Sequence, residues 1–158
     1  MATTAFIKLA GIDGESVTED HVGEIEVMSW NWGLNAATPV QAGGGSGAGR
    51  VLPKDIHFVH RYDKASPMLL RMAASGRHIA SAVLSVRRSG ADPQDALKVT
   101  LKEVLITSLL AGDDGNGTTE HVALSYAEIG FSYRVQSDTG AAGTPVEVDW
   151  NVHTGTVT

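Results

Sequence analysis

The stretch VEVDWNVH at residues 146–153 places an apolar side chain at every second position and a polar or charged one between. Because successive side chains of a strand point to opposite faces of a sheet, this alternation predicts a half-buried β-strand. The strand should turn Val146, Val148, Trp150 and Val152 toward a core and its polar side chains toward water. The C-terminal region therefore indicates a fold built on sheets.

Similar alternation is found in earlier parts of the chain. Residues 129–135 alternate in one phase and residues 122–126 in the other, which predicts a bulge near residues 127–128. The phase also changes within residues 97–110, so this strand either bulges near residues 102–103 or is covered on both faces. Further strands are expected at residues 6–12, 24–33, 55–62 and 78–88. About seven strands at this spacing indicate an all-β sandwich or barrel.

One short helix is expected between two of these strands. Ser66 suits the N-cap, Pro67 the first helical position, and Gly76 the end of the helix. A helix this short is not stable alone, so its apolar stripe must pack on the sheets. The stripe consists of Met68, Leu69, Met72 and Ala73.

Length and composition limit the possible function classes. The 158 residues fit one domain spanning 1–158, and the absence of cysteine fits folding in a reducing cytoplasm. The net charge is −6 and the basic residues are scattered, so no nucleic-acid partner is expected. No apolar run reaches the about 20 residues of a membrane-spanning helix, so no membrane insertion is expected. The first residues do not resemble a signal peptide.

No motif points to catalysis or to a metal. The six histidines are dispersed, and His57 and His60 should lie on opposite faces of one strand, as surface or hydrogen-bonded side chains. Carboxylates such as Glu24 and Asp63 stand beside polar residues, where solvation accounts for them. Residues 113–117, DDGNG, favour a hairpin turn over a calcium loop because the closing glutamate is absent. We therefore predict no enzyme activity, no metal and no cofactor.

A glycine-rich segment and a tryptophan pair are the two features that suggest contacts with partners. Residues 34–52 contain the run GGGSGAG and almost no charge, which predicts an extended loop that orders against a neighbouring subunit. Trp30 and Trp32 bracket Asn31, so both indoles should share the core face. Asn31 should point to the other face, toward solvent or a lumen.

Several short motifs follow one another along the chain. They are FIK at 6–8, GES at 14–16, EIEV at 24–27, WNWG at 30–33, GAGRV at 47–51, DKASP at 63–67 and LKEV at 101–104. In this order they resemble the hemolysin-coregulated protein (Hcp) family, the tube proteins of type VI secretion. The resemblance runs from residue 6 to about residue 152, and its specificity comes from the order of the motifs.

The resemblance implies a β-barrel of two sheets with one flanking helix, assembled as a hexameric ring that stacks into the inner tube of the secretion machine. It implies that Asn31 faces the lumen and that the loop contacts the next ring through Gly43, Gly44, Gly45, Gly47, Gly49 and Arg50. The implied partners are other copies of the chain, effectors in the lumen, and sheath, spike and baseplate components. Such a subunit assembles in the cytoplasm and is then secreted by the type VI system without a signal peptide.

Three alternatives stay open. A phage-type tail tube protein has a similar barrel and also forms stacked hexameric rings. A small-ligand β-barrel would be a monomer with an apolar interior pocket, whereas these strands suggest a densely filled interior. An enzyme would require a nucleophile, metal cluster or phosphate loop, and the sequence offers none.

Overall fold

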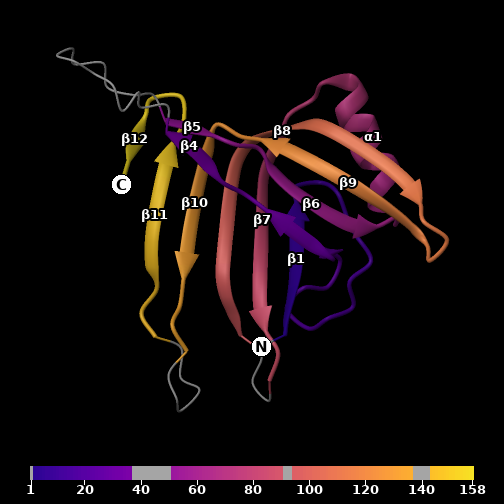
Figure 1. Ribbon diagram of the computed structural model, residues 1–158, viewed down its shortest axis with the longest axis horizontal. Helices are drawn as coiled ribbons and strands as arrows, with labels where there is room; N and C mark the ends of the chain where they lie inside the picture. Colours follow the sequence, from indigo (N-terminus) through magenta and orange to yellow (C-terminus); the bar gives the residue numbers. More distant parts are fainter. Residues whose placement is uncertain (1, 37–50, 91–93, 137–142) are drawn as a thin grey trace.

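A computed structural model describes residues 2–36, 51–90, 94–136 and 143–158 (Figure 1). The larger sheet is antiparallel and runs in the order β12-β11-β10-β8-β7-β1-β2. Its strands are β1 (Thr3–Leu9), β2 (Ile25–Val27), β7 (Ile79–Arg88), β8 (Asp95–Asp113), β10 (Glu128–Tyr133), β11 (Val146–Asn151) and β12 (Thr156–Val157). The expected strand at 24–33 is in fact two strands, β2 and β3 (Ser29–Asn31), that pair with different neighbours.

The second sheet consists of β3, β6 (Ile56–Arg61), β9 (Thr118–Ser125) and the last part of β8. Strand β8 joins the two sheets, because its first part pairs with β7 and β10 and its last part pairs with β9. The change occurs beside Glu103, whose φ of 52° lies in the left-handed region that non-glycine residues rarely adopt. The phase change near residues 102–103 thus coincides with the passage of β8 from one sheet to the other, whereas the register shift in this strand lies between Ile106 and Ser108.

The phase change near residues 127–128 has another cause than the expected bulge. Strands β9 and β10 are separate and lie in different sheets, with Tyr126 and Ala127 between them. Strand β9 pairs with β6 and β8, whereas β10 pairs with β8 and β11. The chain thus crosses from one sheet to the other at this point, which explains why the buried side alternates differently before and after it.

The hydrophobic core lies between the two sheets. Both sheets contribute apolar side chains to it, at alternate positions of their strands, and fully burying one such side chain stabilises the fold by about 1.5–3 kcal/mol. The largest buried side chains include Ile7, Leu9, Ile25, Phe58, Leu84, Leu101 and Leu124.

The hairpin expected at residues 113–117 is present, since β8 ends at Asp113 and β9 begins at Thr118.

The helix α1 (Ala65–Ser75) covers one end of the core beside β8 (Figure 1). Ser66 is not its N-cap but a buried residue of its first turn, and the Asp63 carboxylate accepts the Ala65 N–H at 2.9 Å instead. Gly76 ends the helix with a left-handed φ of 65°. No helix in the described part of the chain is long and apolar enough to cross a membrane.

The predicted all-β class, with two sheets and one short helix, is confirmed, but the described strands leave one side of the barrel open. The expected loop at 34–52 begins and ends in strands, because β4 (Leu34–Ala36) pairs with β5 (Val51–Pro53) as a separate two-stranded arm. The loop residues Gly43, Gly44, Gly45, Gly47, Gly49 and Arg50 lie outside the described residues. The open side of the molecule and this arm adjoin the groove described below.

Candidate functional site

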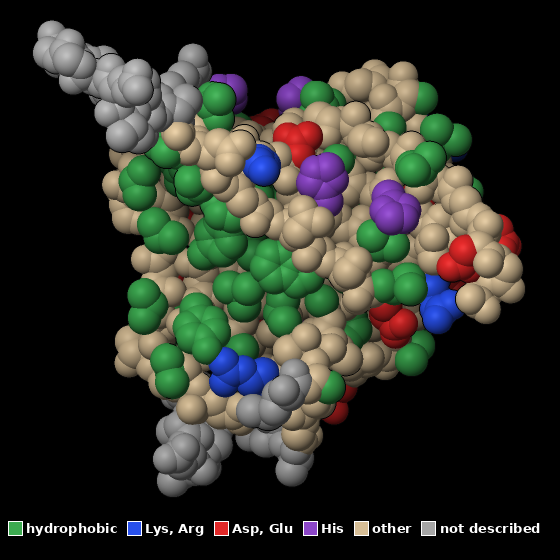
Figure 2. Space-filling view, viewed as in Figure 1, with side chains coloured by type: hydrophobic (Ala, Val, Ile, Leu, Met, Phe, Trp, Pro, Cys, Tyr) green, Lys and Arg blue, Asp and Glu red, His purple; other side chains and the backbone are tan. Residues whose placement is uncertain are grey.

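An apolar groove of about 780 Å³ lies between the β4–β5 arm and strands β10 and β11. Its lining includes Trp32, Leu34, Leu52, Phe131, Val148 and Trp150. Figure 2 shows hydrophobic side chains gathered over β10 and β11 on this side of the molecule. Leu34, Leu52 and Val148 remain 47%, 50% and 42% exposed, so the chain alone leaves these apolar side chains in contact with water.

The groove borders β11 because the rest of the chain covers this strand only in part. The sequence predicts a half-buried strand there, yet its first four residues are exposed, with Val146 at 71%. The alternation is present, but Val148 and Trp150 both line the groove, and of these two only Trp150 also packs against the core. A contiguous apolar surface of this kind typically marks an interaction site.

Trp32 forms a fixed wall of the groove. Its Nε1 donates to the Tyr126 hydroxyl at 2.6 Å, and that hydroxyl donates to the Lys54 carbonyl at 2.7 Å. Burial raises the pKa of Tyr126 above its ordinary value of 10.0, against an opposing effect of the Trp32 hydrogen bond, so the hydroxyl keeps the proton it donates. The indole also packs against the Phe131 ring, with centroids 4.9 Å apart.

Asn31 lies on the other side of its strand from the two tryptophans. Trp30 and Trp32 pack against the core, whereas Asn31 is exposed on β3, directly opposite His57 of β6. Together they line a shallow hollow of about 140 Å³ on the outer face of the second sheet. The alternation predicts this separation of faces, and the structure places an exposed histidine beside the asparagine.

The helix residues named from the sequence differ in burial. Leu69 is fully buried, and Met68 and Met72 are partly buried against the core. Leu70, on the opposite side of the helix, is 60% exposed.

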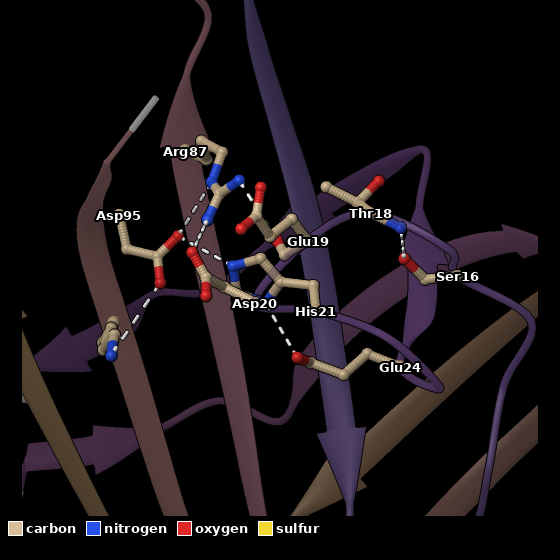
Figure 3. Close-up of polar contacts among 9 residues, drawn as sticks. Ser16, Thr18, Glu19, Asp20, His21, Glu24, Arg87 and Asp95 are labelled. Carbon is tan, nitrogen blue, oxygen red and sulfur yellow. Dashed lines mark hydrogen bonds and ion pairs between the residues drawn. The ribbon is translucent and has the colours of Figure 1, made fainter. Parts of the chain in front are cut away.

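A polar network around His21 fixes the loop between β1 and β2 (Figure 3). Its Nδ1 lies 2.8 Å from Glu24 Oε2 and its Nε2 lies 2.9 Å from Asp95 Oδ1. The ring stacks on Phe6 of β1 at 4.4 Å, nearly parallel to it. Arg87 reaches the same Asp95 oxygen at 3.4 Å. The interpretation of Glu24 as a solvated surface carboxylate is therefore wrong, because it is bonded to a buried histidine.

A second buried histidine lies below the helix. His60 is fully buried, with Nε2 2.9 Å from Glu120 Oε1 and Nδ1 3.8 Å from Asp63 Oδ1. Burial raises the pKa of the Asp63 carboxyl above its ordinary value of 3.8, although the facing His60 lowers it. Solvation does not account for Asp63 either, since its carboxylate accepts the Ala65 N–H at the start of the helix and faces the buried imidazole.

One of these two clusters has a signal in the sequence. His60 continues the buried phase of Ile56 and Phe58, and Glu120 continues that of Val122 and Leu124. Two polar residues on neighbouring strands that each occupy a position otherwise held by apolar residues indicate a buried pair. The strand register places them directly opposite each other. The His21 cluster has no such signal, because its partner Asp95 is remote in the sequence and His21 lies in a loop.

Among the described residues, no group of three or more histidine, cysteine or acidic side chains is placed to hold a metal ion. The site is therefore best described as two surfaces, the apolar groove and the face that carries Asn31, on a scaffold held by buried polar pairs.

Comparisons with known proteins agree with this architecture. The family model described as "Type VI secretion system effector, Hcp" matches residues 6–133. The chain is 38% identical over 156 residues to "Protein hcp1" of Pseudomonas aeruginosa, covering 96% of both chains. It is 26% identical to the "Major exported protein" of the same organism, with 89% of this chain and 95% of that one covered. The crystal structure of Hcp1 from Salmonella typhimurium superposes with a TM-score of 0.83 at 32% identity, covering all of both chains.

Proposed function

The chain belongs to the Hcp family of type VI secretion proteins, and from this premise we propose that it is a structural subunit of the secretion tube. Six copies form a ring, rings stack into the inner tube, and the lumen carries effector proteins. The subunit has no catalytic role of its own. One observation carries this proposal more than any other, namely the apolar groove that the single chain leaves uncovered.

A second copy of the chain is the occupant that best suits the groove. The groove lies beside β11 and β12, at one end of the larger sheet. At the other end, the loop before β2 exposes Val17 at 86% and Val22 at 72%. Two unlike apolar surfaces at opposite ends of one subunit favour a head-to-tail contact, and such contacts close into rings when the rotation permits.

The remaining parts of the proposal follow from the positions of the arm and of Asn31. The β4–β5 arm leads into the glycine-rich residues 43–49, which we assign to ring-to-ring contacts. Asn31, on the exposed face of β3, is assigned to the lumen. Sheath, spike and baseplate components are the expected further partners. Assembly takes place in the cytoplasm, and export then proceeds through the type VI system, in keeping with the name of the "Major exported protein" relative.

Light scattering after size exclusion tests the ring, at several protein concentrations. We expect a mass near six chains for the wild type. Val148→Asp places a charge in the groove and should give monomers, because burying an unpaired carboxylate is costly. Leu70→Asp is the matched control, since Leu70 is more exposed than Val148 and lies on the outer side of the helix; it should keep the ring.

A wild-type chain that stays monomeric at every concentration would overturn the ring proposal. It would also revive the small-ligand β-barrel, because the apolar groove is large enough for a small molecule. The phage-type tail tube makes the same rings, and genes for sheath and baseplate proteins of one system or the other beside this gene distinguish the two.

A further inference from the structure

The outer face of the second sheet carries a pair of exposed histidines next to Asn31. In the strand register Asn31 pairs with His57, and Val59 pairs with His121. His57 and His121 are therefore diagonal neighbours on the same face, with Cα atoms separated by about 7–8 Å. Both line the 140 Å³ hollow together with Asn31, Ser29 and Ser108. Figure 2 shows histidine side chains over β6 and β9 on this face.

The polar groups of the hollow are all able to donate hydrogen bonds. They are two imidazoles, one amide and two hydroxyls, and no carboxylate is among the described residues that line it. The floor is formed by the Val59 side chain, which shares the outward face, and by the strand backbone at Phe58 and Val122, whose side chains are buried in the core. Hydrogen-bond donors converge in this hollow, and no negatively charged side chain among the described residues lines it. Such a hollow suits an anionic group such as a carboxylate.

The charged groups around the hollow do not change its suitability for an anionic group. Two charged residues share the phase of His57, Asp55 directly before β6 and Arg61 at its end; the Asp55 carboxylate accepts the Thr107 hydroxyl at 2.5 Å, and Arg61 adds a positive charge. On β3, β8 and β9 the neighbours facing outward are Ser29, Ser108, Leu110, Thr119 and Ala123, which carry no charge. The net charge of −6 acts over a longer range, and at physiological salt it is screened beyond about 8 Å.

We propose that this hollow binds carboxylate side chains of acidic polypeptide segments, with His57 and His121 as its proton-dependent donors. A histidine gains a second N–H and a positive charge below neutral pH, so binding strengthens as the pH falls. The inference deepens the proposed function, because a hollow on the Asn31 face meets cargo in the lumen of a ring. The chemistry itself belongs to the single chain and does not require the ring.

The experiment measures binding of a fluorescent hexaglutamate peptide to the full chain by anisotropy, at about pH 6 and about pH 8, with hexaglutamine as the uncharged probe. Two exposed charge pairs give roughly a five- to tenfold tighter complex at the lower pH. His57→Asn combined with His121→Asn should abolish this pH dependence. His78→Asn combined with His153→Asn removes two exposed histidines that do not line the hollow, and should preserve it.

Equal pH dependence in the two double variants, or hexaglutamine binding as tightly as hexaglutamate, would overturn the inference. Both double variants change exposed side chains, so they should fold normally, and light scattering on each reports the ring state separately. Histidine-dependent binding by a monomer contradicts the ring but supports the hollow. A ring whose hexaglutamate binding ignores His57 and His121 contradicts the hollow and leaves the ring in place.

Discussion

The imidazole of His21 lies 2.9 Å from the Asp95 carboxylate, which ties the loop before β2 to the first residue of β8. The other ring nitrogen faces Glu24 at 2.8 Å. Both ring nitrogens of His21 therefore have a carboxylate within hydrogen-bond distance. The close approach of the loop to itself supports the same geometry, since a Cβ at Gly14 would lie 2.5 Å from the Glu24 carbonyl oxygen.

His21→Phe should lower the free energy of unfolding by about 1–3 kcal/mol, because it removes the ring nitrogens that contact two partly buried carboxylates. Phenylalanine keeps a flat ring that can stack on Phe6, so the loss reports the polar contacts. Urea unfolding at neutral pH measures it. His78→Phe, at an exposed position away from the groove, should stay within about 0.5 kcal/mol of the wild type. An equal loss in both variants would show that the network contributes nothing specific.

Strands could be predicted from the sequence where alternation is regular, because the period of two is a local property. The strands at 56–61, 79–88 and 146–151 are examples, each within two residues of the expected limits. The sequence does not tell what covers an apolar face. Val146 and Val148 alternate as a core strand does, yet the described part of the chain leaves both exposed. Burial by another chain produces the same pattern as burial by the chain itself.

The buried polar contacts also divide into one that the sequence pattern could predict and one that it could not. His60 and Glu120 stand in apolar phase on strands that pair, so local pattern and sheet register together would locate them. His21 lies in a loop, and its contact with Asp95 depends on the crossing of elements far apart in the sequence. The phase change within residues 97–110 indicates that β8 is irregular near Glu103, but not that the strand passes from one sheet to the other there.

Asp63→Asn should become relatively more stable than the wild type as the pH rises from about 4 to about 7. Burial raises the pKa of the Asp63 carboxyl above its ordinary value of 3.8, so the folded chain holds this proton more tightly than the unfolded chain. The stability that results is present at low pH and is lost as the pH rises through the folded-state value. Asparagine lacks this titration and keeps an oxygen for the Ala65 N–H.

Chemical denaturation of both proteins at several pH values tests the sign. Glu26→Gln is the control, since Glu26 is exposed on β2 and its substitution should give no trend. If the stability difference between Asp63→Asn and the wild type shrinks with rising pH, attraction to His60 outweighs the burial of the carboxylate.

Leu69→Ala should cost about 2–5 kcal/mol of stability, because Leu69 is fully buried where the helix packs on the core. Leu70→Ala changes the same residue type one position later, at a side chain that is 60% exposed, and should cost less than about 1 kcal/mol. Thermal or urea unfolding of the two variants gives the comparison. Similar losses would mean that the helix is held by its exposed side as well, for instance by a partner chain.

Deletion of residues 43–49 should leave single rings intact and abolish their stacking into tubes. Strands β4 and β5 pair from Leu34 with Pro53 to Ala36 with Val51, so the base of the arm has its own ladder and does not need the deleted residues. The groove, to which Leu34 and Leu52 contribute, is therefore preserved, and the mass in solution should stay near six chains.

Electron microscopy of the deletion variant measures tube length, and light scattering measures the ring. A variant with a serine stretch of equal length in place of residues 43–49 separates the effect of loop length from that of glycine content. We expect it to form tubes if only the length of the loop matters, and to form no tubes if the glycines themselves make the contact. Because glycine has no side chain, contacts between the rings would then be made by backbone groups at close approach. Tubes of normal length from the deletion variant would contradict the role of this loop in stacking.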